Sequence, residues 1–187
     1  MRIIGGNLKG KEILFLKTVK TRPLRDMVRE SIFNVIFHSP LINVKIKNSR
    51  ILDIYSGVGS FGIECISREA KNVTFIENDK SALEILKKNF SQLSINKEAI
   101  LIDQTVDLFL RQINLSNKFD IIFLDPPFAE NRYIDELEKV YKLKAYNKNH
   151  LIVIHREKNT FEDLTKIIKT LIVKEYGRSK IIFGVFN

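Results

Sequence analysis

Four consecutive residues, Asp125-Pro126-Pro127-Phe128, bring together groups that could act on a flat amine. Neither proline has an N–H group, so the backbone offers carbonyl acceptors without competing donors, beside a carboxylate and before an aromatic ring. Consecutive prolines also favour a stiff, extended backbone. The stretch therefore suits a planar partner with an NH2 group, although Asp-Pro also opens ordinary turns and the aromatic ring could belong to the core.

A glycine-rich stretch is the second candidate site. Gly57, Gly59 and Gly62 match the G-x-G-x-x-G pattern, and Glu77 ends the next expected strand, where a carboxylate can accept ribose hydroxyls. Asp53 lies shortly before the first glycine, where its charge would repel the pyrophosphate of NAD and attract the ammonium and sulfonium of S-adenosylmethionine. We therefore expect S-adenosylmethionine as the cofactor, with loop capping as the alternative role of Asp53.

Further residues near this loop complete the expected cofactor site. Asp103 follows the third expected strand and could accept from the adenine amine or cap the next helix. The expected cofactor-binding residues are Asp53, Tyr55, Ser56, Gly57, Gly59, Glu77, Asn78 and Asp103.

The two candidate sites should meet at one edge of the sheet, because open α/β sheets bind ligands at the carboxyl ends of their strands. The combined chemistry suits methyl transfer to the exocyclic amine of a base. Such an amine is a weak nucleophile, and acceptance of its two hydrogens by the Asp125 carboxylate and the Pro126 carbonyl would direct its lone pair at the methyl group. Phe128 would stack on the base, which must be extruded or single-stranded to enter.

The hydrophobic pattern predicts the elements that position these residues. Five apolar runs alternate with helices, and two further runs joined by a short link predict an antiparallel pair. The expected fold class is α/β, with a mostly parallel, Rossmann-like, seven-stranded sheet and an antiparallel C-terminal edge hairpin. The expected strands are 51–54, 73–76, 99–102, 119–124, 151–154, 171–173 and 181–183, and the expected helices are 60–68, 79–93, 106–111, 133–143 and 161–168.

Residues 1–49 are expected to form a basic extension to a sheet domain that covers residues 50–187. The extension would hold a β-hairpin over residues 2–16 and a helix over residues 25–37. Residues 1–50 contain 11 Lys/Arg and 3 acids, so 11 − 3 = +8 of the formal net charge of +9 lies there. This charge indicates nucleic acid as the partner, with a solvated lysine-rich surface as the alternative. The expected nucleic-acid contacts, which would be RNA contacts if the polyanion is RNA, are Arg2, Lys9, Lys11, Arg22, Arg25, Arg29 and Arg178.

Composition excludes several other classes of protein. The 187 residues are 44% hydrophobic and 28% charged, and no apolar run approaches the roughly 20 residues that span a bilayer. We expect no signal peptide, because the apolar stretch in residues 1–6 is too short and too broken. We therefore expect a cytoplasmic protein without a membrane partner. The single Cys65 is expected to be a small buried residue. His38, His150 and His155 have no metal-ligand spacing, so we expect no metal site and structural or solvent-facing histidines.

The N-terminal signature carries a resemblance to a known family. Residues 22–34, R-P-L-R-D-M-V-R-E-S-I-F-N, resemble the R-P-T-x-D-R-V-R-E-x-L-F-N signature of the RsmD-type small-subunit ribosomal RNA guanine-N2 methyltransferases. Residues 1–6, 52–62, 67–70, 123–128 and 175–177 are similar in the same order, so the resemblance covers essentially the whole chain.

This resemblance implies a class I S-adenosylmethionine-dependent methyltransferase that methylates one guanine N2 in 16S ribosomal RNA. The RNA would be presented by the small ribosomal subunit or its assembly intermediate. The chain departs from the family pattern at Leu24, Arg25, Tyr55 and Glu69, which leaves the reaction class intact and bears on the exact target nucleotide. The catalytic residues would be Asp125, Pro126, Pro127 and Phe128.

The residues also allow three alternative functions. A DNA or RNA adenine-N6 methyltransferase would use the same loops on another amine, but the chain leaves little room for a target-recognition domain. An NAD-dependent oxidoreductase is disfavoured by Asp53. An inactive RNA-binding module is disfavoured by the intact acids, including Asp125. We expect the protein to act as a monomer.

Overall fold

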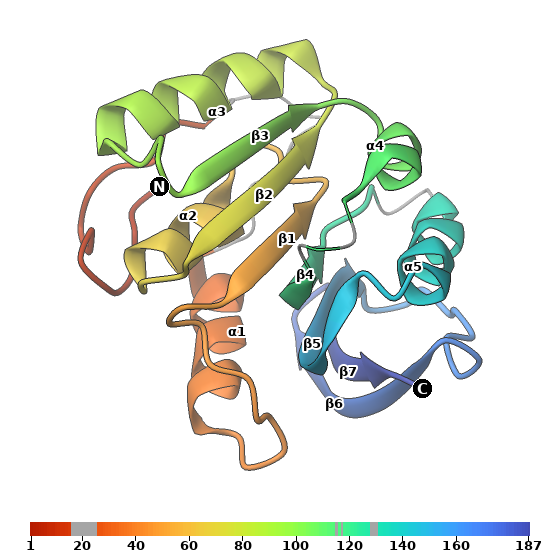
Figure 1. Cartoon of the computed structure of the whole chain (residues 1–187). Helices are drawn as coiled ribbons and strands as arrows, with labels where there is room; N and C mark the ends of the chain where they lie inside the picture. The colour runs from red at the N-terminus through yellow and green to blue at the C-terminus, as the bar shows by residue number, and fades with distance from the viewer. Residues whose placement is uncertain (16–25, 115, 117, 128–130) are drawn as a thin grey trace.

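A seven-stranded sheet forms the centre of the computed structural model, which describes residues 1–15, 26–114, 116, 118–127 and 131–187 (Figure 1). The strand order is β3-β2-β1-β4-β5-β7-β6. The first five strands are parallel and β7 is antiparallel to both of its neighbours, which confirms the expected fold class. The strands are β1 (Arg50–Ile54), β2 (Asn72–Glu77), β3 (Ala99–Asp103), β4 (Phe119–Leu124), β5 (Tyr146–Glu157), β6 (Ile168–Tyr176) and β7 (Ser179–Phe186).

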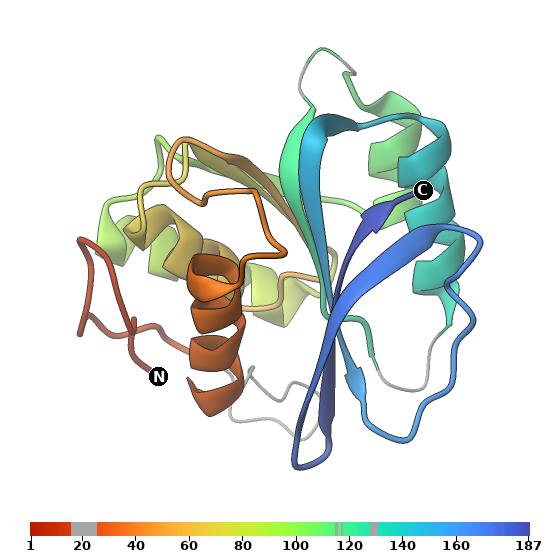
Figure 2. The ribbon, with the colours of Figure 1, turned by 90° about the horizontal axis from the view of Figure 1, so that it is seen from below.

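Helices cover both faces of the sheet, with α1, α2 and α3 on one side and α4 and α5 on the other (Figure 2). Successive side chains of β1 point to opposite faces of the sheet, so Ile51 packs into one hydrophobic cluster and Leu52 and Ile54 pack into the other. Both sides of the sheet are therefore buried, as parallel sheets require. The helices are α1 (Asp26–His38), α2 (Ser60–Ser67), α3 (Lys80–Leu93), α4 (Val106–Gln112) and α5 (Arg132–Lys142).

The strand order reverses direction between β1 and β4, whose carboxyl ends lie side by side. The chain winds outward from β1 to β2 and β3, and from β4 to β5. Such a switch point opens a crevice where doubly wound sheets bind ligands. The fold therefore places the segments that follow β1 and β4 at its natural ligand site.

The expected helix over residues 161–168 is wrong. Residues 161–164 have no regular structure, residues 165–167 form a turn, and Ile168 already begins β6. The Asp163 carboxylate accepts from the Thr165 backbone N–H at 3.1 Å and from its hydroxyl at 2.6 Å. Such local bonds compete with helix formation, and Glu162 is drawn into a buried ion pair with Arg156.

The expected hairpin at the N-terminus is reduced to one isolated bridge, between Arg2 and Glu12. Within the described part of this segment, residues 1–15, no strand forms, although the Ile3 N–H donates to the Lys11 carbonyl at 3.0 Å and the Ile13 N–H to the Met1 carbonyl at 2.8 Å. The backbone N–H groups of Ile4 and Gly5 bind a side chain of α2, and Ile3 and Ile13 enter the same hydrophobic cluster as β1. The separation of residues 1–49 from the sheet domain stays a prediction.

Two further findings concern the single cysteine and the length of the helices. Cys65 is fully buried, as expected. Among the described helices, none is long and apolar enough to cross a membrane.

Candidate functional site

Asp53 and Asp125 flank the switch point of the sheet. Asp53 lies in β1 beside Phe123 of β4, and Asp125 follows β4 directly. The Asp125 backbone N–H donates to the Ile54 carbonyl at 3.4 Å, which extends the pairing of β1 and β4 by one residue. The two candidate sites expected from the sequence therefore meet at one sheet edge.

The glycine loop after β1 is tied to the end of β2 by Glu77. One carboxylate oxygen, Oε2, accepts from the Gly57 N–H at 2.7 Å, and Oε1 accepts from the N–H groups of Asn78 and Asp79, each at 2.8 Å. Gly57 has a positive φ of 55°, a conformation in which glycine is preferred. A carboxylate has about four acceptor positions, so Glu77 retains room for a hydroxyl.

Asp53 is held by the start of α2. Its Oδ2 accepts from the Gly62 N–H at 3.0 Å, and the residue is only 1% exposed. A Cβ at Gly62 would lie 2.3 Å from the Phe75 ring and 2.8 Å from Asp53 Oδ2, so only glycine lets the helix approach this closely. Within the described residues, the other Asp53 oxygen, Oδ1, is buried without a hydrogen-bond partner.

The environment of Asp53 opposes its negative charge. Burial raises the pKa of this carboxyl well above its usual range, and the charges of Asp125 and Glu77 raise it further, against the Gly62 hydrogen bond that lowers it. An unpaired oxygen in a buried carboxyl is a costly arrangement. A cation placed against Oδ1 would remove this cost, so the site is suited to a positively charged ligand group.

The other expected cofactor residues differ in their placement. The Ser56 hydroxyl donates to the Ile76 carbonyl at 3.2 Å, and the Tyr55 hydroxyl donates to the buried Glu136 of α5, so both side chains support the loop. Asn78 and Asp103 are exposed at the sheet edge. The alternative role of Asp103 as a helix cap is not found, because Thr105 caps α4.

The Asp125-Pro126-Pro127 segment is held by two consecutive residues of β5. His155 Nδ1 lies 2.7 Å from Asp125 Oδ1, and Arg156 Nη1 donates to the Pro127 carbonyl at 3.2 Å. Asp125 keeps 25% of its side chain exposed, so it remains accessible. Phe128 lies outside the described residues.

Arg156 is itself fixed by a buried ion pair. Its Nε lies 2.7 Å from Glu162 Oε1, with side-chain exposures of 0% and 2%. The guanidinium also lies over the Tyr133 ring, 4.7 Å from its centre. The anchoring of Pro127 to the core is therefore rigid, and the Pro127 carbonyl acts in support of the loop.

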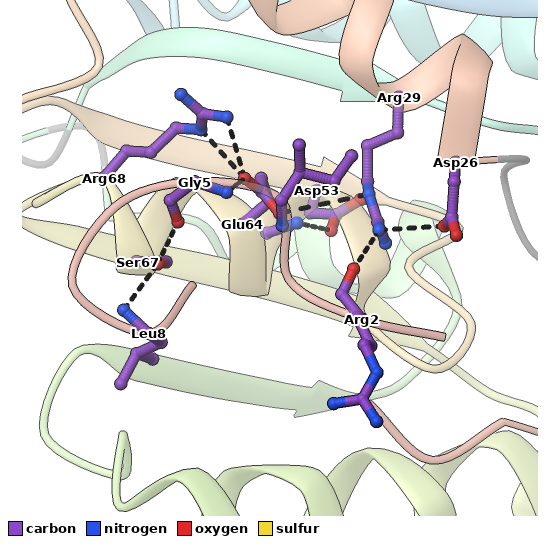
Figure 3. A network of polar contacts seen from close by, with 11 residues as sticks. Arg2, Gly5, Leu8, Asp26, Arg29, Asp53, Glu64, Ser67 and Arg68 are labelled. Carbon is purple, nitrogen blue, oxygen red and sulfur yellow. Dashed lines mark hydrogen bonds and ion pairs between the residues drawn. The ribbon is translucent and has the colours of Figure 1, made fainter. Parts of the chain in front are cut away.

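The prediction that Arg29 contacts RNA is wrong, because its side chain is fully buried. It donates to the Arg2 carbonyl, pairs with Asp26 at 3.0 Å and lies 4.0 Å from Glu64 of α2 (Figure 3). Burial lowers the pKa of Arg29, and the charges of Glu64 and Asp26 oppose that shift. The arginine thus holds the N-terminal segment against α1 and α2.

The remaining basic residues expected to contact RNA lie in several places. Arg2, Lys9 and Lys11 are exposed on the N-terminal segment. The turn that precedes Lys9 is bound to the far end of α2, where the Asn7 N–H donates to the Ser67 carbonyl at 2.7 Å. Arg178 is exposed in the β6–β7 turn and pairs with Glu157. Arg22 and Arg25 lie outside the described residues, and contact of the others with RNA stays a prediction.

Comparison with known proteins gives matches over nearly the whole chain. The model of the family described as Conserved hypothetical protein 95 matches residues 1–185. The ribosomal RNA small subunit methyltransferase D of Buchnera aphidicola subsp. Baizongia pistaciae is 34% identical over 186 residues, which cover 100% of this chain and 91% of that protein. The chain belongs to the ribosomal RNA small subunit methyltransferase D family.

Other members and solved structures agree with this family. The methyltransferase D of Haemophilus influenzae is 37% identical over 160 residues, or 85% of this chain and 80% of that protein. A crystal structure of a candidate methylase from Haemophilus influenzae superposes with a TM-score of 0.77 at 32% identity, covering 98% of this chain and 96% of that one. A candidate methyltransferase from Escherichia coli gives a TM-score of 0.80 at 25% identity, covering 98% and 96%.

Sequence reasoning missed several residues that support this methyltransferase D site. His155, Arg156 and Glu136 each contact a loop residue that the sequence did identify. Their local patterns carry no signal, because His155 and Arg156 lie in an apolar strand and Glu136 in an amphipathic helix. A buried charge within a β-strand, as at Arg156, is the one feature that could have drawn attention.

Proposed function

We propose that the protein transfers a methyl group from S-adenosylmethionine to the exocyclic N2 of a guanine in small-subunit ribosomal RNA. The observation that carries this proposal is the position of Asp125, partly exposed and fixed at the switch point beside the buried Asp53. The relatives named ribosomal RNA small subunit methyltransferase D support the choice of RNA. We expect the protein to act in the cytoplasm as a monomer.

The residues around the glycine loop fit S-adenosylmethionine, the cofactor of these methyltransferases. Asp53 Oδ1, buried and unpaired among the described atoms, would accept from the cofactor ammonium, and Glu77 would accept from a ribose hydroxyl. A Cβ at Gly57 would meet no atom within 4 Å, so this glycine borders open space at the loop. The cofactor supplies an electrophilic methyl group on a sulfonium.

The chain's own residues would prepare the amine. A guanine amine donates its lone pair into the ring, which makes it a poor nucleophile. One of its hydrogens would bind Asp125 Oδ2, because Oδ1 is occupied by His155. The Pro126 carbonyl would accept the other hydrogen, and Phe128 would stack on the base. Together these contacts would aim the lone pair and stabilise the positive charge that develops on nitrogen.

Asp53→Asn should have opposite effects on cofactor binding and on stability. Loss of the negative partner for the ammonium should weaken S-adenosylhomocysteine binding by roughly 10- to 100-fold, the range for a hydrogen bond to a charged group. Because the folded pKa of Asp53 is raised, the unfolded chain loses this proton first, and the stability of the free protein falls as pH rises above about 4, the unfolded pKa. Calorimetry and melting curves at several pH values measure both effects.

The stability of Asp53→Asn relative to the parent protein should therefore increase with pH. At low pH both proteins carry a neutral side chain at this position. A stability difference that stays constant from pH 4 to pH 9 would show that the pKa of Asp53 is the same in the folded and unfolded states, which would contradict the raised pKa of the buried carboxyl. Unchanged binding of S-adenosylhomocysteine would remove Asp53 from the cofactor site.

The substrate is tested by mapping methylated nucleosides with mass spectrometry. The protein is incubated with S-adenosylmethionine and with small ribosomal subunits, naked small-subunit RNA or DNA, each from cells that lack this modification. We expect N2-methylguanine in the small-subunit RNA, and more of it in the particle than in naked RNA. N6-methyladenine as the product would replace this proposal with the adenine-N6 alternative.

A further inference from the structure

We infer that His155 is a positioning residue for Asp125, which it holds so that one defined carboxylate oxygen faces the substrate amine. This inference rests on the proposed function for its effect on turnover. Two hydrogen bonds carry this inference, and they connect the end of β4, strand β5 and the start of β7. His155 Nδ1 lies 2.7 Å from Asp125 Oδ1, and Nε2 lies 2.9 Å from the Ser179 hydroxyl.

The ring is built into the sheet, so its orientation is set by the fold. His155 lies in β5, which pairs with β4 on one side and β7 on the other. Asp125 directly follows β4 and Ser179 begins β7, so each ring nitrogen reaches toward a neighbouring strand. The side chain is only 9% exposed, and such burial restricts its rotation.

The hydrogen-bonding groups of Asp125 and Ser179 show which ring nitrogen of His155 carries the hydrogen. An ionised carboxylate can only accept, so Nδ1 must carry the hydrogen in the bond to Asp125. In the neutral ring, Nε2 then accepts from the Ser179 hydroxyl. The Asp125 carboxylate therefore selects the tautomer, and the Ser179 hydroxyl, which can donate or accept, completes it by donating to Nε2.

The consequence for Asp125 is that its two oxygens become different. Oδ1 is engaged by His155, while no hydrogen bond reaches Oδ2 from the described part of the chain. Oδ2 is thus the oxygen left for a substrate amine. A carboxylate without the histidine could rotate about its terminal torsion, which is broad for aspartate.

The next residue of β5 secures the backbone of the same loop. Consecutive side chains of a strand point to opposite faces, so His155 and Arg156 approach the loop from different sides. Arg156 donates to the Pro127 carbonyl at 3.2 Å. The pair therefore fixes both the Asp125 carboxylate and the backbone that follows it, which matters because a displacement of about 1 Å can reduce turnover about 100-fold.

His155→Leu and His155→Asn separate positioning from simple packing, because the two new side chains have nearly the same shape. The asparagine NH2 can stand where Nδ1–H stood, whereas leucine has no donor. We expect His155→Leu to lower kcat by about 10- to 100-fold with little change in KM for RNA, and His155→Asn to recover most of that loss. Ser179→Ala should lower kcat by a smaller factor. Methyl transfer to small ribosomal subunits measures all three variants.

His150 provides a matched control in the same strand. It is 8% exposed, its Nδ1 lies 2.9 Å from the Asn147 carbonyl, and its Nε2 accepts from the Phe186 N–H at 2.8 Å. His150→Leu should therefore cost stability as His155→Leu does, but leave kcat per folded molecule unchanged. Equal kcat values for the leucine and asparagine variants at position 155, or equal losses at positions 150 and 155, would overturn the positioning role.

A measurement without turnover keeps this inference distinct from the proposed function. Nitrogen-15 NMR of the histidine rings should show the Nδ1–H tautomer at His155, with a proton resonance that shifts in Asp125→Ala while that of His150 does not. A failure of the parent protein to methylate any RNA would defeat the proposed function, and this NMR result would still report the contact. A His155 ring that is protonated only on Nε2 would defeat the inference.

Discussion

Asp125→Asn is expected to lower turnover by about 100- to 1000-fold while S-adenosylhomocysteine binds with nearly unchanged affinity. His155 donates to one oxygen of Asp125, so the asparagine should turn its own oxygen toward His155. Its NH2 group would then face the NH2 group of the guanine, and two donors would meet where the parent protein offers an acceptor. Radiolabelled methyl transfer and calorimetry with S-adenosylhomocysteine measure the two quantities.

Asp120→Asn is the matched control for this prediction. Asp120 lies in the same strand, β4, and its carboxylate binds the Arg50 N–H at 2.8 Å and the Asn147 side chain at 2.7 Å, at the opposite end from Asp125. This variant should lose some stability and keep the turnover of each folded molecule. Turnover of Asp125→Asn within a few-fold of the parent protein would show that Asp125 does not contact the reacting amine.

Glu64→Gln is expected to lower the free energy of unfolding by about 3 to 5 kcal/mol, the range for removal of one partner from a buried ion pair. Glu64 is fully buried and accepts from the N–H groups of Ile4 and Gly5, each at 2.8 Å. It also pairs with Arg68 at 2.9 Å and lies 4.0 Å from the buried Arg29 (Figure 3). A glutamine leaves both arginines without this charge and directs a donor at one of the backbone N–H groups. Urea unfolding measures the change.

Glu138→Gln is the control, because it removes the same charge from an exposed pair. Glu138 binds Lys142 at 2.8 Å within α5, with side-chain exposures of 44% and 67%. The cost of this change should stay below about 1 kcal/mol, as for other surface ion pairs. Similar urea midpoints for the two variants would mean that Glu64 does not hold the N-terminal segment in the way the structure indicates.

The contacts of Glu64 also show that part of the N-terminal signature has a structural role, where the sequence had indicated a contact with RNA. Arg29 looked like a phosphate contact because its position on a helix surface cannot be judged from spacing alone. In the fold it lies beneath the Arg2 carbonyl and beside Glu64. Part of this arginine-rich signature thus joins the N-terminus to the helix that begins at the cofactor loop, which couples the basic segment to the site.

Local patterns in the sequence determined most of the framework. Periodicity placed the seven strands, and glycine spacing identified the loop after β1, because strand alternation and positive-φ turns are encoded within a few residues. Asp125 was found in the same way, since two prolines after a buried strand are visible locally. The helix expected over residues 161–168 failed because Asp163 and Glu162 bind partners that helix periodicity does not reveal.

Only the tertiary structure decided which residues support the chemistry. His155 lies 30 positions from Asp125 in the chain, and Glu64 lies 60 positions from Ile4, yet each pair is in hydrogen-bond contact. Such contacts depend on which strands become neighbours and which helix face packs inward, and both follow from burial of the whole hydrophobic core. The sequence therefore identified the groups that we propose act on the substrate, and the fold decided the groups that hold them in place.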